Sequence, residues 1–218
     1  MAIDAGPRAF ILLSILLVIV TSTSHVCADA NTLSDFTLSL GYANVSVGGS
    51  DSELNSQNAF KWEAAFTIAP IAELPQLRIG AAVGVPLVLD DSDRTIISHN
   101  GTLIITGSSD VPFFVIEPEA RISWRQSFGQ FFIEPGVGIG GAFAYLSIDT
   151  DGDAGDETFD KWQSTWMARA FIYAGLEVPG GLAGIEFSYM QGGNMDFGDN
   201  AQGDISEYYI GVFGTLQF

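Results

Sequence analysis

The chain has 218 residues, of which 26 are Asp or Glu and 8 are Lys or Arg, so its formal net charge is −18 at pH 7. This acidic excess argues against binding to DNA or RNA, because eight dispersed cations cannot build a phosphate-binding patch. Charged residues make up only 16% of the chain and hydrophobic residues 47%, which argues against a disordered chain. The length predicts a single domain.

Residues 1–30 have the order of a secretory signal peptide. Arg8 gives a weakly positive start, residues 9–20 are almost entirely apolar, and small residues suited to cleavage follow. The apolar run is shorter than the roughly 20 residues that a spanning helix needs. We therefore expect residues 1–30 to be removed and residues 31–218 to form the folded domain.

After the signal, apolar residues recur at every second position, which is typical of β-strands. No helical stripe of any length appears. The alternation occurs in eight segments, at residues 36–43, 60–68, 77–85, 114–124, 131–145, 165–177, 184–189 and 207–218.

The connections between these segments alternate in length. Short ones are expected at residues 71–76, 126–129 and 179–181, and longer polar ones at residues 47–58, 90–110, 148–160 and 192–204. Short turns at one end and long loops at the other are typical of outer-membrane barrels. The sequence therefore predicts an all-β fold, an eight-stranded antiparallel up-and-down transmembrane β-barrel.

Charged residues avoid the apolar positions of all eight segments and share the alternate positions with glycine and alanine. We expect that second face to line the lumen, because a Lys or Arg facing lipid costs about 2–4 kcal/mol near the membrane midplane. The predicted lumen charge network consists of Lys61, Glu63, Arg78, Glu117, Glu119, Arg121, Glu134, Arg169, Glu177, Glu186 and Glu207.

A soluble, lipocalin-like barrel with its apolar face turned inward needs the same alternation. Two observations favour the membrane. The small residues on the polar face suit a crowded lumen, and aromatic residues gather near both ends of the segments, as in the girdles at membrane interfaces. Trp124 and Phe131 lie near the predicted short turns, and Tyr42 and Trp166 near the long loops.

The last segment has apolar residues at alternate positions and a terminal phenylalanine. The residues concerned are Tyr208, Ile210, Val212, Leu216 and Phe218. This ending resembles the assembly signal of bacterial outer-membrane proteins, and the domain resembles the small eight-stranded barrels typified by the OmpA transmembrane domain and OmpX. The resemblance implies insertion by the barrel-assembly machinery and contact with outer-membrane lipid. It implies little about activity.

Pro118 and Pro135 lie inside predicted strands, where each gives up a ladder hydrogen bond. We expect a bulge in this hairpin, or else one shorter strand. A four-residue turn at residues 126–129 would place Arg121 opposite Glu134. Such lumen pairs predict either an ion-pair network that fills the barrel or an ion-selective gate. Eight strands leave just enough room for side chains, which favours the network.

The acidic segment at residues 149–160 has carboxylates with the spacing of a calcium-binding loop. Alanine replaces the turn glycine of that motif, and aspartate replaces its final glutamate. A solvated acidic loop and weak contact with Ca²⁺ or Mg²⁺, bridging to anionic headgroups, are the alternatives. No other cofactor is expected. The candidate ligands are Asp149, Asp151, Asp153 and Asp160.

The sequence favours a non-enzymatic role, because the only histidine after the signal is His99 and no catalytic motif accompanies it. Apolar residues at 96–97 and 103–106 predict that two strands extend into a hairpin above the membrane, usable for adhesion or strand addition. We expect a structural or surface-interaction protein of the outer membrane, active in envelope integrity or adhesion. A narrow ion or small-solute channel and a soluble periplasmic lipid-binding barrel are the alternatives, and the oligomeric state stays open.

Overall fold

The computed structural model describes residues 34–48, 57–88, 96–99, 102–105, 113–150, 157–197 and 202–218, so the predicted signal peptide lies outside the described residues. The regular structure of the described residues is entirely β-strand. The strands are β1 (Ser34–Val47), β2 (Gln57–Ile68), β3 (Leu77–Val88), β4 (Ile96–His99), β5 (Thr102–Ile105), β6 (Phe113–Trp124), β7 (Gln126–Phe128), β8 (Phe131–Thr150), β9 (Glu157–Val178), β10 (Gly181–Asp196) and β11 (Gln202–Gln217).

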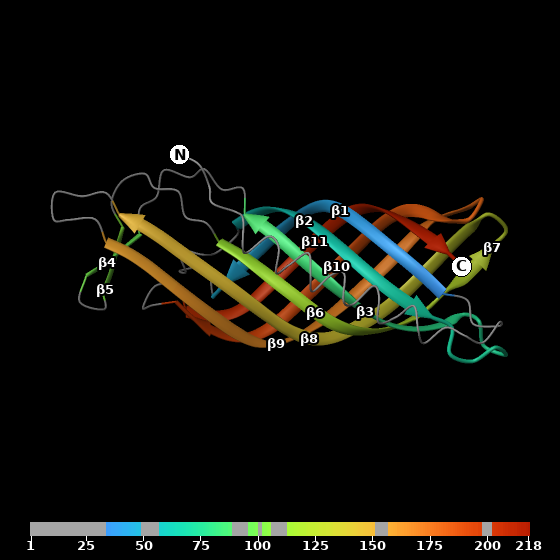
Figure 1. The fold of residues 1–218 in the computed structure, drawn as a ribbon, viewed down its shortest axis with the longest axis horizontal. Helices are drawn as coiled ribbons and strands as arrows, with labels where there is room; N and C mark the ends of the chain where they lie inside the picture. The colour runs from blue at the N-terminus through green and yellow to red at the C-terminus, as the bar shows by residue number, and fades with distance from the viewer. Residues whose placement is uncertain are drawn as a thin grey trace.

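The long strands close into a barrel (Figure 1). Each pairs antiparallel with its neighbours in the order β1, β2, β3, β6, β8, β9, β10 and β11, and β11 returns to pair with β1. The closing pair runs from Asp35 opposite Gln217 to Val47 opposite Ile205. The short strand β7 prolongs the line of β6 along β8. The prediction of an eight-stranded antiparallel barrel is therefore confirmed.

Tight turns join the strands at one end. Residues 129–130 connect β7 to β8, and residues 179–180 connect β9 to β10. Gly129 and Gly180 have φ angles of 70° and 82°, a left-handed conformation that only glycine adopts without strain. The turn predicted at residues 126–129 was placed too early, because β7 continues the strand up to Phe128, which lies opposite Phe131.

The two prolines leave the register of the hairpin unchanged. Ile116 faces Phe143 and Glu119 faces Gly140, so neither strand holds an extra residue around Pro118. Pro135 faces Ile172 within an unbroken ladder between β8 and β9. The predicted bulge and the alternative of a shortened strand were both wrong. Each proline gives up a hydrogen bond to one neighbouring strand, and the rest of the ladder keeps the register. Among the described strand pairs, the register shifts at one place, where β10 pairs with β11 between Gln191 and Asn194.

The alternation of side chains sets the two faces of the wall. Leu38, Leu40 and Tyr42 on β1 are 53%, 49% and 50% exposed, whereas Lys61 and Glu63 on β2 are 0% and 2% exposed. Apolar side chains therefore point outward and charged ones inward. A soluble barrel with an apolar interior would have the opposite arrangement, so that alternative was wrong. The outward apolar surface makes this a transmembrane β-barrel.

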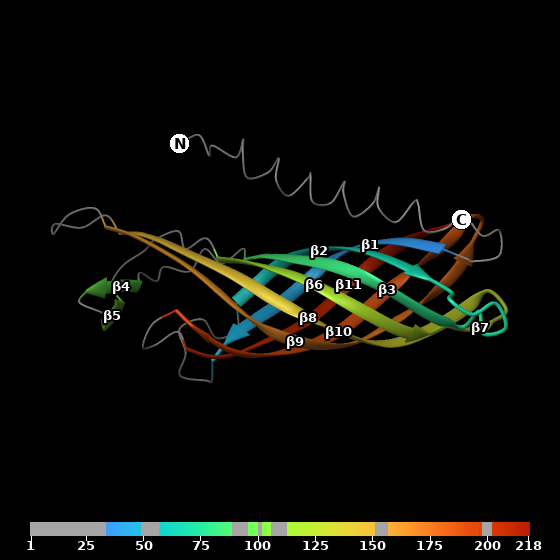
Figure 2. The same ribbon diagram turned by 60° about the horizontal axis from the view of Figure 1, so that its bottom comes forward.

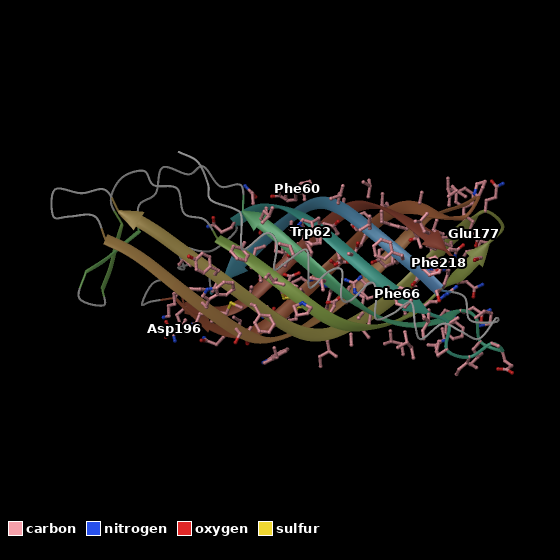
Figure 3. All side chains as sticks on the ribbon, viewed as in Figure 1. Phe60, Trp62, Phe66, Glu177, Asp196 and Phe218 are labelled. Carbon is pink, nitrogen blue, oxygen red and sulfur yellow. The ribbon has the colours of Figure 1, made fainter. Side chains whose placement is uncertain are left out.

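Aromatic side chains form two outward belts, as predicted. Trp166 and Tyr208 are exposed near the long connections, and Phe131 and Phe218 near the tight turns. Figure 3 shows this spacing along β2, where Phe60 and Trp62 are followed by Phe66, whose ring centroid lies 6.4 Å from that of Phe218. Aromatic rings at these levels fit the two membrane–water interfaces.

Two features project beyond the barrel at the long-loop end. Strands β8 and β9 have 20 and 22 residues and stay paired as far as Thr150 opposite Glu157. Strands β4 and β5 form a separate two-stranded sheet at the same end (Figures 1 and 2). The predicted hairpin is thus present, but as its own sheet rather than as an extension of β3 and β6. None of the described residues form a helix long and apolar enough to cross a membrane.

Candidate functional site: a filled lumen

The middle of the lumen holds a cluster of charged side chains, here called the central charge cluster. Five strands, β2, β6, β9, β10 and β11, supply it, and each member is 5% exposed or less. Three cations and five carboxylates make up the cluster. They are Lys61, Arg121, Arg169, Glu63, Glu117, Glu119, Glu186 and Glu207.

Arg169 on β9 is the hub of this cluster. Its guanidinium lies 3.0 Å from Glu207, 3.1 Å from Glu119 and 3.8 Å from Glu63, and it also pairs with Glu117. A fifth bond of 3.3 Å reaches the Ser188 hydroxyl. Arg169 thereby links β9 to β2, β6, β10 and β11 through side chains alone.

The other two cations complete the network. Lys61 Nζ lies 2.6 Å from both Glu117 Oε2 and Glu207 Oε1. Arg121 Nη1 lies 2.6 Å from Glu63 Oε1, and Arg121 Nε pairs with Glu119 on the same strand. Buried charges are tolerated only when they are paired and hydrogen-bonded, and each of these cations contacts at least two carboxylates.

Glycines on the inward face make room for the long charged side chains. A Cβ atom at Gly84 would come within 2.7 Å of Lys61 and 3.0 Å of Glu117. A Cβ atom at Gly138 would lie 2.9 Å from the Glu119 carboxyl carbon. The small residues on the polar face thus serve the crowded lumen that the sequence indicated.

A second charge cluster, the basal cluster, lies toward the tight turns and consists of Asp35, Arg78, Arg125 and Glu134. Arg125 lies 2.8 Å from Asp35 and 2.6 Å from Glu134, and Arg78 lies 3.4 Å from Asp35. The Ser123 hydroxyl donates to Glu134 at 2.6 Å. Two cations face two carboxylates, so this cluster is balanced.

The predicted pair of Arg121 and Glu134 was wrong. The register places Arg121 opposite Gly138, four residues from the predicted position, because the turn lies at residues 129–130. Glu134 instead binds Arg125, and Arg121 belongs to the central charge cluster. Arg78 was placed correctly in the lumen but lies in the basal cluster.

Glu177 does not belong to the lumen network, contrary to the prediction. It is exposed at the end of β9, where it accepts a 2.6 Å hydrogen bond from the Ser127 hydroxyl. Figure 3 shows Glu177 at the same end of the barrel as Phe218 and opposite to Asp196. Glu177 keeps the inward alternation of β9, since it lies opposite the buried Leu182, but it stands at the rim beside the turn, where it is exposed.

Apolar side chains fill the lumen on both sides of the central charge cluster. Toward the tight turns, an aromatic cluster packs against both charge clusters, with Arg121 4.7 Å from the Phe171 ring centroid and Arg125 5.7 Å from that of Phe132. The members of this aromatic cluster are Phe132, Phe171, Tyr173, Leu182 and Phe213.

Toward the long loops, an apolar plug closes the lumen. Its members are buried residues of the inward face and of the strand ends, namely Ala43, Val45, Val47, Ala59, Val115, Ala142, Ala144, Leu146, Met167, Met190, Met195, Phe197, Ile205 and Tyr209. Lys61 Nζ lies 5.3 Å from the centroid of the Tyr209 ring, so the plug rests on the central charge cluster. The cavity left beside the aromatic cluster has a volume of only about 10 Å³, the space of a single water molecule.

The predicted metal site falls largely outside this description. Asp151 and Asp153 lie outside the described residues, and the side chains of Asp149 and Asp160 are not described. The backbone differs from a loop, since Asp149 and Asp160 belong to β8 and β9 and face Thr158 and Ser147. Within the described ranges, no three His, Cys, Asp or Glu side chains are grouped to hold a metal ion. Calcium binding at residues 149–160 stays a prediction.

The proposed assembly signal lies on the outer face of β11. The side chains of its five residues are between 47% and 67% exposed, which confirms that they face outward as predicted; they are Tyr208, Ile210, Val212, Leu216 and Phe218. Recognition of this strand by the assembly machinery stays a prediction.

Solved structures of bacterial membrane proteins share this architecture. The crystal structure of Neisserial surface protein A aligns over 87% of this chain and 98% of its own, with 12% identity and a TM-score of 0.54. A major outer membrane protein from Thermus thermophilus aligns over 86% of this chain and 99% of its own, with 10% identity and a TM-score of 0.57. The chain has the fold of outer-membrane β-barrels. No protein-family model and no curated protein matches the sequence.

The predicted lumen network left out three contributors, although the alternation puts two of them, Arg125 and Tyr173, on the inward face. Asp35 continues the inward alternation of β1 by one step beyond the predicted segment, and Arg125 follows β6 directly. Tyr173, an inward position among apolar neighbours, accepts a 2.8 Å hydrogen bond from Arg121 and donates to Glu63 at 3.4 Å. Extending the alternation of the first segment by one step would have found Asp35 as well.

Proposed function

We propose that the protein is an integral barrel of the bacterial outer membrane with a structural or surface-interaction role, contributing to envelope integrity or adhesion. The observation that carries the proposal is the filled lumen within an apolar outer wall. Two charge clusters, an aromatic cluster and an apolar plug occupy the interior of the described barrel, and none of them forms a catalytic constellation. The useful surface is therefore the long-loop end.

The projecting arm of β8 and β9 supports a surface role. A transmembrane strand needs roughly 9–11 residues, so strands of 20 and 22 residues continue well past the bilayer. The separate sheet of β4 and β5 lies at the same end. Paired strands hold a fixed shape outside the membrane, which suits contact with another surface or molecule.

The channel alternative has less support. A conducting eight-stranded barrel needs a continuous polar path, whereas here Lys61, Arg121 and Arg169 are each held by at least two carboxylates under an apolar plug. Transport would require breaking several buried ion pairs at once.

Fractionation and a truncated arm test the proposal. We expect the protein in the outer-membrane fraction, migrating differently in cold and in boiled SDS because a compact barrel stays folded until heated. Replacing residues 148–159 with a two-residue Asn-Gly turn should keep that heat-dependent shift and reduce attachment of intact cells to surfaces, or their resistance to detergent. Recovery in the soluble periplasm would contradict the membrane location. Unchanged attachment and unchanged resistance would contradict the role of the arm.

A further inference from the structure

The outer wall carries a groove of about 540 Å³ that crosses β9, β10, β11 and β1. Two rows of outward side chains, in register across the strands, border it. The row nearer the long loops consists of Ala170, Tyr189 and Tyr208. The row nearer the tight turns consists of Ile172, Phe187, Ile210 and Tyr42.

The groove exists because a small residue stands beside large ones. Ala170 faces Tyr189, whose ring centroid lies 4.7 Å from that of Tyr208, and the short alanine leaves the wall low over β9. Outward residues of one strand recur about 7 Å apart. Carbon atoms attract best at roughly 3.5–4.0 Å, so a hydrocarbon chain lying over Ala170 can contact the larger side chains that border the groove.

Hydroxyl groups lie along the same groove, on its long-loop side. The Tyr42 hydroxyl donates to Asn58, and the Tyr189 hydroxyl donates to Gln191 at 2.7 Å. The Tyr208 hydroxyl has no hydrogen-bond partner among the described residues, and its side chain is 63% exposed. A tyrosine at a membrane interface presents its ring to the apolar side and its hydroxyl to the polar side.

We propose that this groove binds one acyl chain of a membrane lipid, with the Tyr208 hydroxyl donating to an ester or phosphate oxygen of that lipid. The groove is continuous with the lipid-facing wall, so lipid reaches it from the bilayer without crossing protein. The site goes beyond the proposed surface role, which does not require a bound lipid.

Contact and hydrogen bonding, rather than the hydrophobic effect, set the affinity of such a site. Acyl chains in a bilayer already have apolar surroundings, so moving one into the groove gains only close packing and the bond to Tyr208. Filling the groove with a larger side chain should therefore remove most of the preference for bound lipid over bulk lipid.

Native mass spectrometry of the intact barrel tests the proposal. The protein is released from detergent micelles titrated with dioleoyl phosphatidylethanolamine, and the fraction carrying one lipid is measured. Ala170→Leu fills the groove, and Ala120→Leu makes the same change at an exposed, outward alanine on β6, away from the groove. Heat-dependent mobility in SDS shows that each variant is folded.

We expect one retained lipid in the unaltered protein and in the Ala120 variant, and about tenfold weaker retention in the Ala170 variant. Tyr208→Phe should weaken retention severalfold, because it keeps the ring and removes the donor. Equal retention by the two alanine variants would overturn the site. A species of twice the protein mass that Ala170→Leu abolishes would overturn it too, because the groove would then hold a second copy of the chain. No effect of Tyr208→Phe would overturn the hydrogen bond.

Discussion

The two charge clusters of the lumen differ in charge balance and in their place along the barrel. The central charge cluster has three cations against five carboxylates from five strands, and Arg169 alone contacts four of these acids. The basal cluster has two cations and two carboxylates, and Arg125 contacts both acids. Both clusters join strands that are not neighbours in the sheet, since Arg125 after β6 pairs with Asp35 on β1. They differ in that the basal cluster lies near the tight turns and is neutral, whereas the central one has an excess of acid.

This difference shows how a narrow barrel accommodates buried charge. Near the turns, each charge meets a complementary partner and the cluster is neutral. In the middle, acids outnumber cations, so every cation is shared and removing one leaves five buried carboxylates with only two cations. The central cluster should therefore be the more sensitive of the two to loss of a cation.

The largest effect is expected for Arg169→Ala. The change leaves buried carboxylates without their shared cation and should lower the free energy of unfolding by about 3–5 kcal/mol, measured by urea titration of the refolded barrel in lipid vesicles. Arg78→Ala, in the basal cluster, is the control and should cost clearly less. A loss for Arg78→Ala equal to that for Arg169→Ala would break the comparison. If Arg169→Ala does not fold, Arg169→Lys should fold with an intermediate loss.

The cations of the central cluster are tolerated because carboxylates pair with them. A cation placed at the same level on the outer wall, where it has no such partner, tests this explanation. Ile139 is 67% exposed and follows Gly138, which packs against Glu119. Ile139→Arg should cost about 2–4 kcal/mol in a bilayer. Val178→Arg, at the end of β9, should cost about 0–1 kcal/mol because the interface accepts charge. Equal costs for the two variants in vesicle unfolding would contradict a lipid-facing outer wall.

A double-mutant cycle sharpens the account of the basal cluster. Alanine substitutions at Arg125 and Glu134 should show a coupling energy of about 0.5–3 kcal/mol, because the two side chains are 2.6 Å apart. Substitutions at Arg121 and Glu134 should be additive within about 0.5 kcal/mol. Coupling between Arg121 and Glu134, without coupling between Arg125 and Glu134, would contradict the observed register and support the one with a turn at residues 126–129.

The smallest effect is expected for an exposed ion pair outside the lumen. Lys161 and Asp196 are 3.7 Å apart at the long-loop end, and their side chains are 32% and 56% exposed. Lys161→Ala should cost about 0.2–1 kcal/mol, less at high salt, because water and ions screen the pair. A loss above about 2 kcal/mol, insensitive to salt, would show that burial is not what separates strong from weak pairs here.

The strands and their faces could be predicted from the sequence because a lipid-facing charge is costly and the period of two is regular. That rule alone places Lys61, Glu63 and Arg169 inside and Leu38 and Ile139 outside. The pairs between strands could not be predicted, because they depend on turn length. Moving the turn from residues 126–129 to residues 129–130 shifted the register by four residues and gave Glu134 a new partner. The balance of each cluster depends on cross-lumen contacts that no local pattern encodes.

The groove was not visible in the sequence either. Ala170 looks like any other small residue on an apolar face, and its role depends on having Tyr189 and Tyr208 beside it in register. At the end of β9 the sequence pattern instead predicted a lumen residue that the structure does not place in the network. Glu177 fits the alternation, yet it lies outside the lumen network because it stands at the exposed rim beside the turn.

The most direct test of the central claim, that side chains fill the lumen, is single-channel recording of the purified barrel in a planar lipid bilayer. We predict no conductance steps for the unaltered protein, because the apolar plug and the paired charges leave no continuous water path. A combined Arg169→Ala and Lys61→Ala variant that still folds should also give no steps, because the apolar plug stays in place. Regular steps from the unaltered protein, abolished by heating, would contradict a filled lumen and favour the channel.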